Sequence, residues 1–434
     1  MAISQPIISK LAQYLKSAKL RQIILLYSIN VASIPLGILT NMLVTSYLGA
    51  NAYGDYQFIN NIFTFFVVLF TFGFFQAANR AIVTTHKADD IKEIYGATLV
   101  ITISLSILMS IGLFAYSILD TNIQNKKLDS ILQILIPFSW IYLILNYFEV
   151  LFQADNKITL LSIVRLVPKV GFLLAVVGIQ HFYRDSFYDK VLLIWQFYIG
   201  TQIIVYVYTI YKIGPKFSNL INRIKSLWIY NKSFGLDVYW GTVFSVGLSQ
   251  MTGILISYFG LDNSGVGFFS LAMAFSTPLL FIPNTIATTQ YKEFSKSPFI
   301  PRKLLLFTAS LSIVSLLILW LIIPPFINHF YGASFQPVIY LNFVVSIGII
   351  FHGMADFYNR FLGSHGQGKI LRNSSVIVGI VTLIANFSLI PNFGENGAVY
   401  ARMISGITYF ICMLLYYLYY TRAKHDKILQ IIKN

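Results

Sequence analysis

Three acidic residues lie within long apolar segments of the sequence: Glu149, Asp237 and Asp356. A charged side chain in an apolar medium is costly, so such residues usually face one another or a water-filled cavity. A carboxylate in that setting is a candidate for carrying a proton or binding Na+. These three acids are therefore our candidates for ion coupling in a transport cycle.

Five basic residues accompany the acids inside or at the ends of apolar segments: Arg80, Arg165, Lys169, Arg360 and Arg402. A guanidinium forms two parallel hydrogen bonds to phosphate oxygens, so buried arginines favour a phosphate-bearing ligand. Two alternatives stay open. Asp356 and Arg360 would form a structural ion pair, and basic residues near segment ends would reach the membrane surface as anchors.

Two polar stripes lie on predicted helices, because their members recur at helical spacing. They consist of Tyr142, Asn146, Glu149 and Gln153 in one segment and of His352, Asp356 and Arg360 in another. Each stripe places amide, imidazole or charged groups on one helix face. We expect both to line a water-filled cavity between two helix bundles, with Arg80, Arg165, Lys169, Asp237 and Arg402.

The elements that position these side chains are membrane helices. The chain has 434 residues, of which 56% are hydrophobic and 11% charged, with a mean hydropathy of +0.70. Soluble domains have about 25% charged residues. The apolar residues form blocks of roughly 20, which is the length of a helix that crosses a bilayer. The twelve predicted spans are 22–48, 57–83, 97–119, 131–152, 163–182, 191–211, 234–260, 266–289, 304–330, 337–362, 374–390 and 398–420.

The positive charges predict the orientation of these spans. Lys and Arg number 26 in the two termini and the even-to-odd connections but only 4 in the odd-to-even connections. Cytoplasmic loops carry the excess of positive charge, so both termini are predicted to be cytoplasmic. The basic flanks indicate contact with the lipid bilayer rather than with nucleic acid.

A repeated hairpin divides the chain. SYLGANAYGDYQF begins at Ser46 and SYFGLDNSGVGFF at Ser257, and a weaker copy, NFGENG, begins at Asn392. Because six spans separate the first two copies, the halves enter the membrane in the same direction, which predicts a pseudo-two-fold axis along the membrane normal. The glycines suit tight external turns that need positive φ.

The predicted fold is thus an all-α integral membrane protein with about twelve transmembrane helices in two six-helix bundles. The predicted parts are a cytoplasmic or interfacial segment, the first bundle, a cytoplasmic linker, the second bundle and a cytoplasmic tail. Their boundaries are 1–21, 22–211, 212–233, 234–420 and 421–434. Lys residues alternate with apolar positions at helical spacing over residues 7–20, which favours a helix on the anionic inner leaflet.

The first hairpin and the span ending GFFQAANRAIV resemble Wzx-type flippases of the MOP (multidrug/oligosaccharidyl-lipid/polysaccharide) exporter superfamily. The span ends YFEVLFQADNKI and FYNRFLGSHGQGKI are similar to that family as well. The resemblance implies transport of a polyprenyl-pyrophosphate-linked oligosaccharide, of O-antigen (lipopolysaccharide) or capsule type, across a bacterial cytoplasmic (inner) membrane. It implies alternating access, coupling to H+ or Na+ or to the membrane potential, and polysaccharide polymerase or assembly proteins as partners.

Two other functions are less favoured by the sequence. A MATE-like drug or small-molecule antiporter is one, because the related drug exporters carry an acid in the first span, which here has Asn30 and Asn41 instead. A polysaccharide polymerase or membrane glycosyltransferase usually needs a large loop or a nucleotide-sugar domain, and the predicted loops are short. The sequence contains no P-loop, HExxH motif or metal-ligand cluster, so we expect no enzyme activity, cofactor or metal site.

Overall fold

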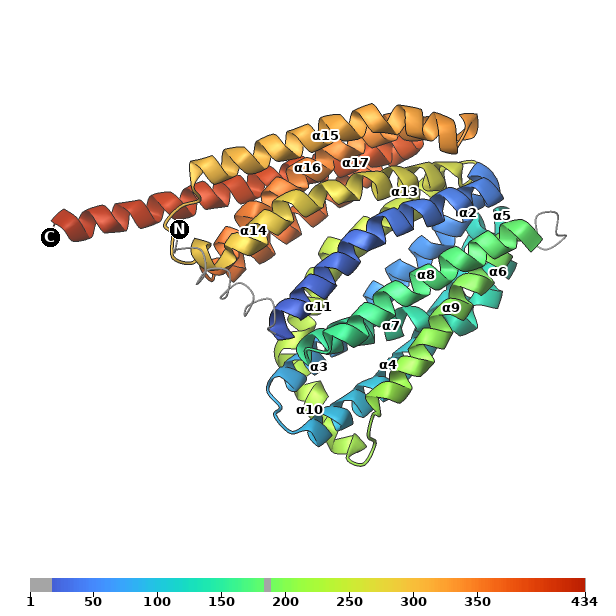
Figure 1. Cartoon of the computed structure of the whole chain (residues 1–434), viewed down its shortest axis with the longest axis horizontal. Helices are drawn as coiled ribbons and strands as arrows, with labels where there is room; N and C mark the ends of the chain where they lie inside the picture. Colours follow the sequence, from blue (N-terminus) through green and yellow to red (C-terminus); the bar gives the residue numbers. More distant parts are fainter. Residues whose placement is uncertain (1–17, 183–188, 434) are drawn as a thin grey trace, which may run out of the picture. The chain divides into compact units, whose positions relative to one another are not determined.

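The computed structural model describes residues 18–182 and 189–433, and within these ranges the chain forms helices and turns without a strand (Figure 1). The predicted interfacial helix over residues 7–20 lies almost entirely outside the described residues. The helices up to the middle of the chain are α2 Ala18–Phe70, α3 Phe74–Val83, α4 Ala88–Leu119, α5 Thr121–Asn125, α6 Asp129–Leu135, η1 Ile136–Phe138, α7 Trp140–Ala154, α8 Ile158–Phe182, α9 Lys190–Ile213 and α10 Leu220–Tyr230.

The remaining helices continue without a strand in the described part of the chain. They are η2 Asn231–Gly235, α11 Leu236–Thr242, η3 Val243–Gly247, α12 Leu248–Phe259, α13 Ser264–Ser276, η4 Thr277–Leu280, α14 Phe281–Phe294, α15 Arg302–Phe330, η5 Ala333–Phe335, α16 Pro337–Ser364 and α17 Gly368–Lys433.

Eight helices of the described residues are long and apolar enough to cross a membrane, or nine if the bent pair 129–138 and 140–154 forms one span. The two longest, α2 and α17, each contain a glycine with non-helical backbone, Gly49 (φ 76°) and Gly394 (φ 56°). Helix α17 holds two predicted spans, whereas α2 holds the first span and part of the second, which continues in α3. The seventh predicted span is divided among η2, α11, η3 and α12. Helical structure therefore accompanies all twelve predicted spans, and the chain is a multi-pass membrane protein.

Two compact units make up the chain. The first unit comprises Met1–Tyr47 and Phe70–Tyr239, and the second comprises Leu48–Leu69 and Trp240–Asn434. The second half of α2, which the sequence analysis placed in the first bundle, therefore packs within the second unit. The predicted bundle boundaries at 211 and 234 stay a prediction.

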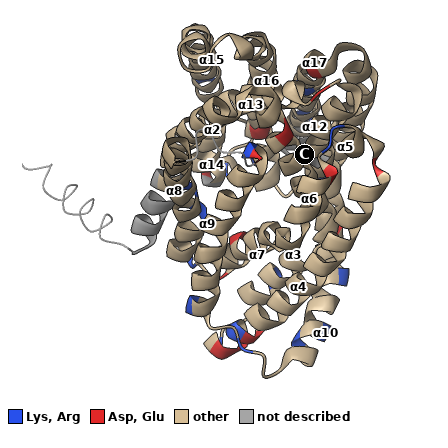
Figure 2. Ribbon diagram, turned by 90° about the vertical axis from the view of Figure 1, so that its right-hand side faces the viewer, with Lys and Arg blue, Asp and Glu red and all other residues tan. Residues whose placement is uncertain are grey.

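In the first unit, the start of α4 is joined to the loop between α9 and α10. Arg223 contacts two acids of α4, with Nη2 2.6 Å from Asp90 Oδ1 and Nε 2.9 Å from Glu93 Oε2. The Lys216 ammonium lies 2.8 Å from Asp89 Oδ1. Basic and acidic residues accordingly gather around α10 (Figure 2). We call these five residues the α4 charge cluster. Three belong to α4, and Lys216 and Arg223 belong to the predicted linker 212–233.

The substitution Arg223→Ala is expected to weaken the attachment of residues 214–223 to α4 through the α4 charge cluster. Amide hydrogen exchange over residues 214–223 should become faster in the variant, because two carboxylates lose their shared partner. In the unaltered protein, exchange should also rise with salt concentration, since ions screen partly exposed charge pairs. The matched control is Lys225→Ala, an exposed cation of the same helix. Unchanged exchange in Arg223→Ala would contradict this role.

In the second unit, the two copies of the repeated hairpin pack against each other. The Asn263 amide donates a 2.7 Å hydrogen bond to Asp55 Oδ1. A Cβ atom on Gly54 would lie 1.9 Å from the Asn263 carbonyl oxygen, so only glycine fits there. Positive φ is confirmed at Gly49 but was a wrong expectation for Gly260, whose φ is −88°. Close approach of two backbones, rather than turn geometry, accounts for Gly54.

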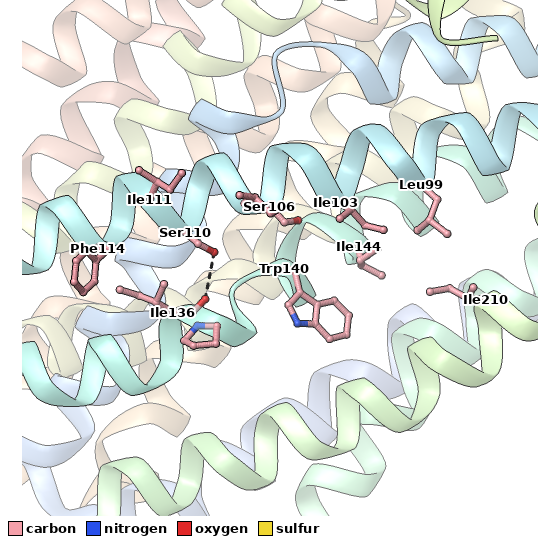
Figure 3. A pocket seen from close by; sticks show the side chains of 12 residues that line it. Leu99, Ile103, Ser106, Ser110, Ile111, Phe114, Ile136, Trp140, Ile144 and Ile210 are labelled. Carbon is pink, nitrogen blue, oxygen red and sulfur yellow. Dashed lines mark hydrogen bonds between the residues drawn. The ribbon is translucent and has the colours of Figure 1, made fainter. Parts of the chain in front are cut away.

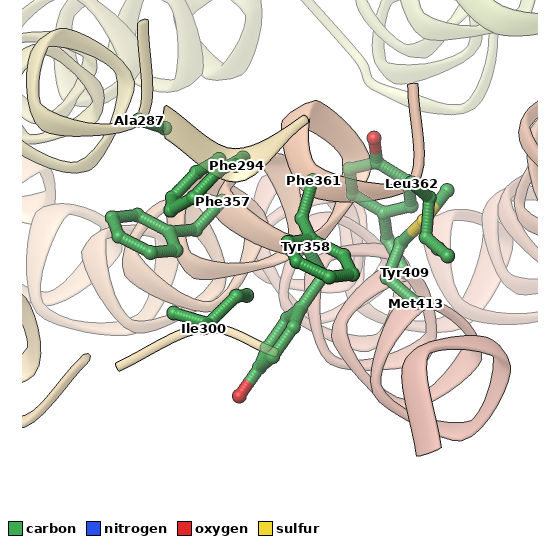
Figure 4. Packing of buried hydrophobic residues seen from close by; sticks show 10 residues of the cluster. Ala287, Phe294, Ile300, Phe357, Tyr358, Phe361, Leu362, Tyr409 and Met413 are labelled. Atoms are coloured by element: carbon green, nitrogen blue, oxygen red, sulfur yellow. The ribbon is translucent and has the colours of Figure 1, made fainter. Parts of the chain in front are cut away.

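The core at one end of the second unit is aromatic. It contains ten buried residues from α14, α16, α17 and the segment before α15 (Figure 4): Ala287, Phe294, Ile300, Ala355, Phe357, Tyr358, Phe361, Leu362, Tyr409 and Met413. Phe294 makes edge contacts with Phe357 and Phe361 at centroid distances of 5.5 and 5.7 Å. This packing fixes α16 against the second half of α17, which carries Arg402, a residue of the cavity described next.

Candidate functional site

A polar cavity lies within the second unit. Its volume is about 260 Å³, and a smaller cavity of about 170 Å³ shares three of its residues, Ser249, Thr382 and Arg402. We refer to the two together as the polar cavity. Side chains of the larger part come from α2, α12, α13 and α17: Gln57, Asn61, Ser249, Gln250, Thr252, Gly253, Phe269, Ser270, Met273, Thr382, Asn386 and Arg402. Neither part has an Asp or Glu among its lining residues.

Arg402 supplies the charge of the polar cavity. Arg402 as a whole is partly exposed. Its Nε, however, is shielded from solvent and has no hydrogen-bond partner among the described residues. None of the ion pairs between described residues involves Arg402. A shielded guanidinium N–H without a protein partner is costly. Arg402 is therefore our candidate for binding an anion in this cavity.

Asp356 is held by a neighbouring tyrosine rather than by a base. Tyr409 donates a 3.0 Å hydrogen bond to Asp356 Oδ1, and Asn359 donates a 2.7 Å hydrogen bond to Tyr409 Oη. The His352 ring lies 4.8 Å from the Tyr409 ring, and His352 and Tyr409 line the smaller part of the polar cavity. The alternative Asp356–Arg360 ion pair is absent from the described residues, and Arg360 is exposed.

In the first unit, a second group of predicted site residues lies on α7 and α8. Arg165 Nε is 2.9 Å from Glu149 Oε1, and both side chains are about one-third exposed or less. Lys169 follows Arg165 by one helical turn, and Asn146 precedes Glu149 by one turn. Because Glu149 and Arg165 neutralise each other, Lys169 carries the net charge of this group.

The other predicted residues of the first unit are separate from that pair. The Arg80 guanidinium lies 5.0 Å from the centroid of the Phe234 ring, a cation–π contact, and the residue is exposed. Gln153 and Asp237 are exposed as well. The structure thus brings together Glu149 with Arg165, and His352 with Arg402 around the polar cavity. That the two stripes and the five further residues all line one central cavity stays a prediction.

Four amide residues of the polar cavity were not among the predicted site residues: Gln57, Asn61, Gln250 and Asn386. A signal for them was present. Tyr53, Gln57 and Asn61 follow at i, i+4 and i+8, as do Thr382 and Asn386 at i and i+4. These amides did not stand out because they carry no charge and because Gln57 and Asn61 belong to the stretch interpreted as a hairpin.

A cavity of another kind lies in the described part of the first unit. This groove, of about 680 Å³, is lined almost wholly by apolar side chains of α4, η1, α7 and α9 (Figure 3). Ser110 on its wall is already bonded, since its Oγ lies 3.1 Å from Ser139 Oγ. An apolar groove of this composition suits hydrocarbon and offers few groups to a sugar or phosphate. The polar cavity is therefore the better candidate site.

Comparison with known proteins gives the family. The family model described as "Polysaccharide biosynthesis protein" matches residues 20–297. The chain belongs to this polysaccharide biosynthesis protein family. No curated protein sequence matches the chain.

Among solved structures, the lipid II flippase MurJ in its inward closed conformation is similar, with a TM-score of 0.71 and 15% identity over 90% of this chain and 87% of that one. An inward-facing multidrug resistance MATE family transporter of the MOP superfamily is also similar, with a TM-score of 0.68 and 11% identity over 94% and 99%. The MATE multidrug transporter DinF-BH has a TM-score of 0.61 and 14% identity over 90% and 94%. The predicted fold is confirmed as that of MOP superfamily transporters.

Proposed function

We propose that this member of the polysaccharide biosynthesis protein family is a flippase for a polyprenyl-pyrophosphate-linked oligosaccharide repeat unit. It would move the unit from the inner to the outer leaflet of the bacterial cytoplasmic membrane, for O-antigen or capsule synthesis. The observation that carries this proposal is the polar cavity, where Arg402 presents a shielded, unpartnered guanidinium N–H among amides and hydroxyls.

The chemistry of the polar cavity matches the head group of such a lipid. A guanidinium binds phosphate oxygens, and amides bind sugar hydroxyls. A cationic drug is less well matched, because no carboxylate lines the cavity. The lipid II flippase MurJ and a MATE family transporter have folds similar to that of this chain. Likeness to MurJ supports the flippase, and the MATE-like antiporter is the alternative that an experiment has to exclude.

Transport would proceed by alternating access, with the polyprenyl tail remaining in the lipid while the head group passes through the protein. Asp356 is our first candidate for coupling to H+ or Na+, since it lies beside the polar cavity and its carboxylate is bonded to a neutral tyrosine. Glu149 is a weaker candidate because Arg165 already neutralises it. Asp237 is the third candidate. The membrane potential is an alternative source of energy, since one charge moving through about 100 mV gains roughly 2.3 kcal/mol.

Depletion of this protein in its host is expected to trap lipid-linked repeat units on the cytoplasmic face. These units can be measured by their resistance to a glycosidase added outside spheroplasts. Re-expression of the intact chain should restore access, and re-expression of a chain that lacks the second unit should not. If depletion changes drug tolerance and leaves the units accessible outside, the antiporter alternative is correct and the flippase proposal fails.

A further inference from the structure

Amide side chains form one wall of the polar cavity. Gln57 and Asn61 come from α2, Gln250 from α12 and Asn386 from α17. Four primary amides from three helices converge on a cavity of about 260 Å³ inside a membrane protein. Asn386 is buried and the other three are partly buried, and each primary amide offers both N–H donors and a C=O acceptor to a ligand in the cavity.

The α2 amides are held in place by specific neighbours. The Gln57 Nε2 donates a 2.8 Å hydrogen bond to the hydroxyl of Tyr53, which is fully buried. Asn61 packs against Gly253, because a Cβ atom added to that glycine would lie 2.0 Å from Asn61 Nδ2. With these contacts, both amides have a fixed orientation toward the polar cavity.

Helix α17 contributes a second set of hydrogen-bonded side chains. Asn386 is buried and its Nδ2 donates a 3.0 Å hydrogen bond to Thr252 Oγ1. One turn earlier, Thr382 Oγ1 lies 2.7 Å from Ser405 Oγ. Arg402, which also comes from α17, adds the single positive charge. Two of the four amides, Gln57 and Asn386, are thus held by hydrogen bonds within the protein.

We propose that the polar cavity is a glycan subsite, in which the amide wall binds the hydroxyl or acetamido groups of one sugar ring beside an anionic group held by Arg402. An amide both donates and accepts, as a sugar hydroxyl does, so the two match in pairs. The larger part of the polar cavity, about 260 Å³, is just smaller than pockets for drug-sized ligands, which suits one ring rather than a whole repeat unit. This inference rests on the proposed flippase function and names the part of its substrate that the second unit recognises.

Sugar recognition by this wall is tested through binding of the glycan alone. The probe is the tritiated oligosaccharide released by mild acid from the host's own lipid-linked unit, so it has neither lipid nor pyrophosphate. The full chain, purified into lipid nanodiscs, should bind it. The double variant Gln57→Leu with Asn61→Leu should bind at least tenfold more weakly. Asn392→Leu, which alters an exposed amide of α17 outside the cavity, should bind as the unaltered chain does.

A second variant changes the position of Asn61 rather than its chemistry. Gly253→Ala keeps every amide but displaces Asn61 from its place, and it should weaken binding in the same direction. Equal affinity of the double variant and the unaltered chain overturns the inference, and so does an unaltered chain that fails to bind. The same purified chains are also placed in lipid vesicles and assayed for movement of the complete lipid-linked unit between leaflets. If the unaltered chain moves none, the flippase proposal fails separately, whatever the binding result.

Discussion

Arg402→Ala is expected to lower the rate of glycan export by roughly ten- to a hundredfold, because a hydrogen bond to a charged group contributes roughly 1.5–3 kcal/mol. The guanidinium Nε has no hydrogen-bond partner among the described residues, and Arg402 lines both parts of the polar cavity. No other Lys or Arg lines that cavity in the described structure. The measurement is surface polysaccharide in cells that depend on the variant, at matched protein amounts.

Two further variants separate the effect of the guanidinium from that of charge and from that of losing any arginine. Arg402→Lys keeps the positive charge but loses the planar guanidinium. Its export should therefore lie between that of Arg402→Ala and that of the unaltered chain. Arg422→Ala removes an exposed arginine near the end of α17 and should export normally. Normal export by Arg402→Ala would exclude the polar cavity as the anion site, although the chain would still belong to its family.

Gly406→Ala is expected to destabilise the second unit by about 1–3 kcal/mol, the usual cost of overpacking a well-packed interior. A Cβ atom there would lie 2.1 Å from the Gly348 carbonyl oxygen, and a Cβ on Gly348 would lie 2.6 Å from Met403 Cα. Small residues let membrane helices approach closely. Because backbone cannot move aside as a side chain can, α16 and α17 must separate, which also displaces Arg402.

A thermal unfolding series of the purified chain in detergent measures this effect. Gly406→Ala should unfold at a clearly lower temperature, and export should fall with it. Gly368→Ala, at the start of α17, is the matched control, since an added Cβ there meets nothing within 4 Å. Equal unfolding temperatures for the two variants would show that the close approach of α16 and α17 is not needed.

The helices could be predicted from the sequence because apolar blocks of about 20 residues report directly on the membrane. The glycine-containing hairpins were also visible, and Gly49 and Gly394 do have positive φ. The reason for Gly54 was not visible. It depends on the carbonyl of Asn263, which belongs to the other half of the chain, and a single sequence does not reveal which segments approach each other.

The candidate site was predictable only in part, for a related reason. Arg402 and His352 stood out, since charged and imidazole groups inside apolar segments are rare. The same logic gave Asp356 a base as its partner, whereas the structure gives it Tyr409, which a sequence with 28 tyrosines does not single out. The amides Gln57 and Asn386 carry no charge, so they gained significance only when three helices brought them to one wall.

The most direct test of the central claim is reconstitution. The purified chain is placed in vesicles of defined lipid, the lipid-linked repeat unit is added to one leaflet, and its arrival in the other leaflet is followed with a membrane-impermeant glycosidase. We predict transfer much faster than in protein-free vesicles, and transfer by Arg402→Ala that is slower than by the unaltered chain by roughly ten- to a hundredfold. If the unaltered chain moves the unit no faster than protein-free vesicles do, this account of the protein is contradicted.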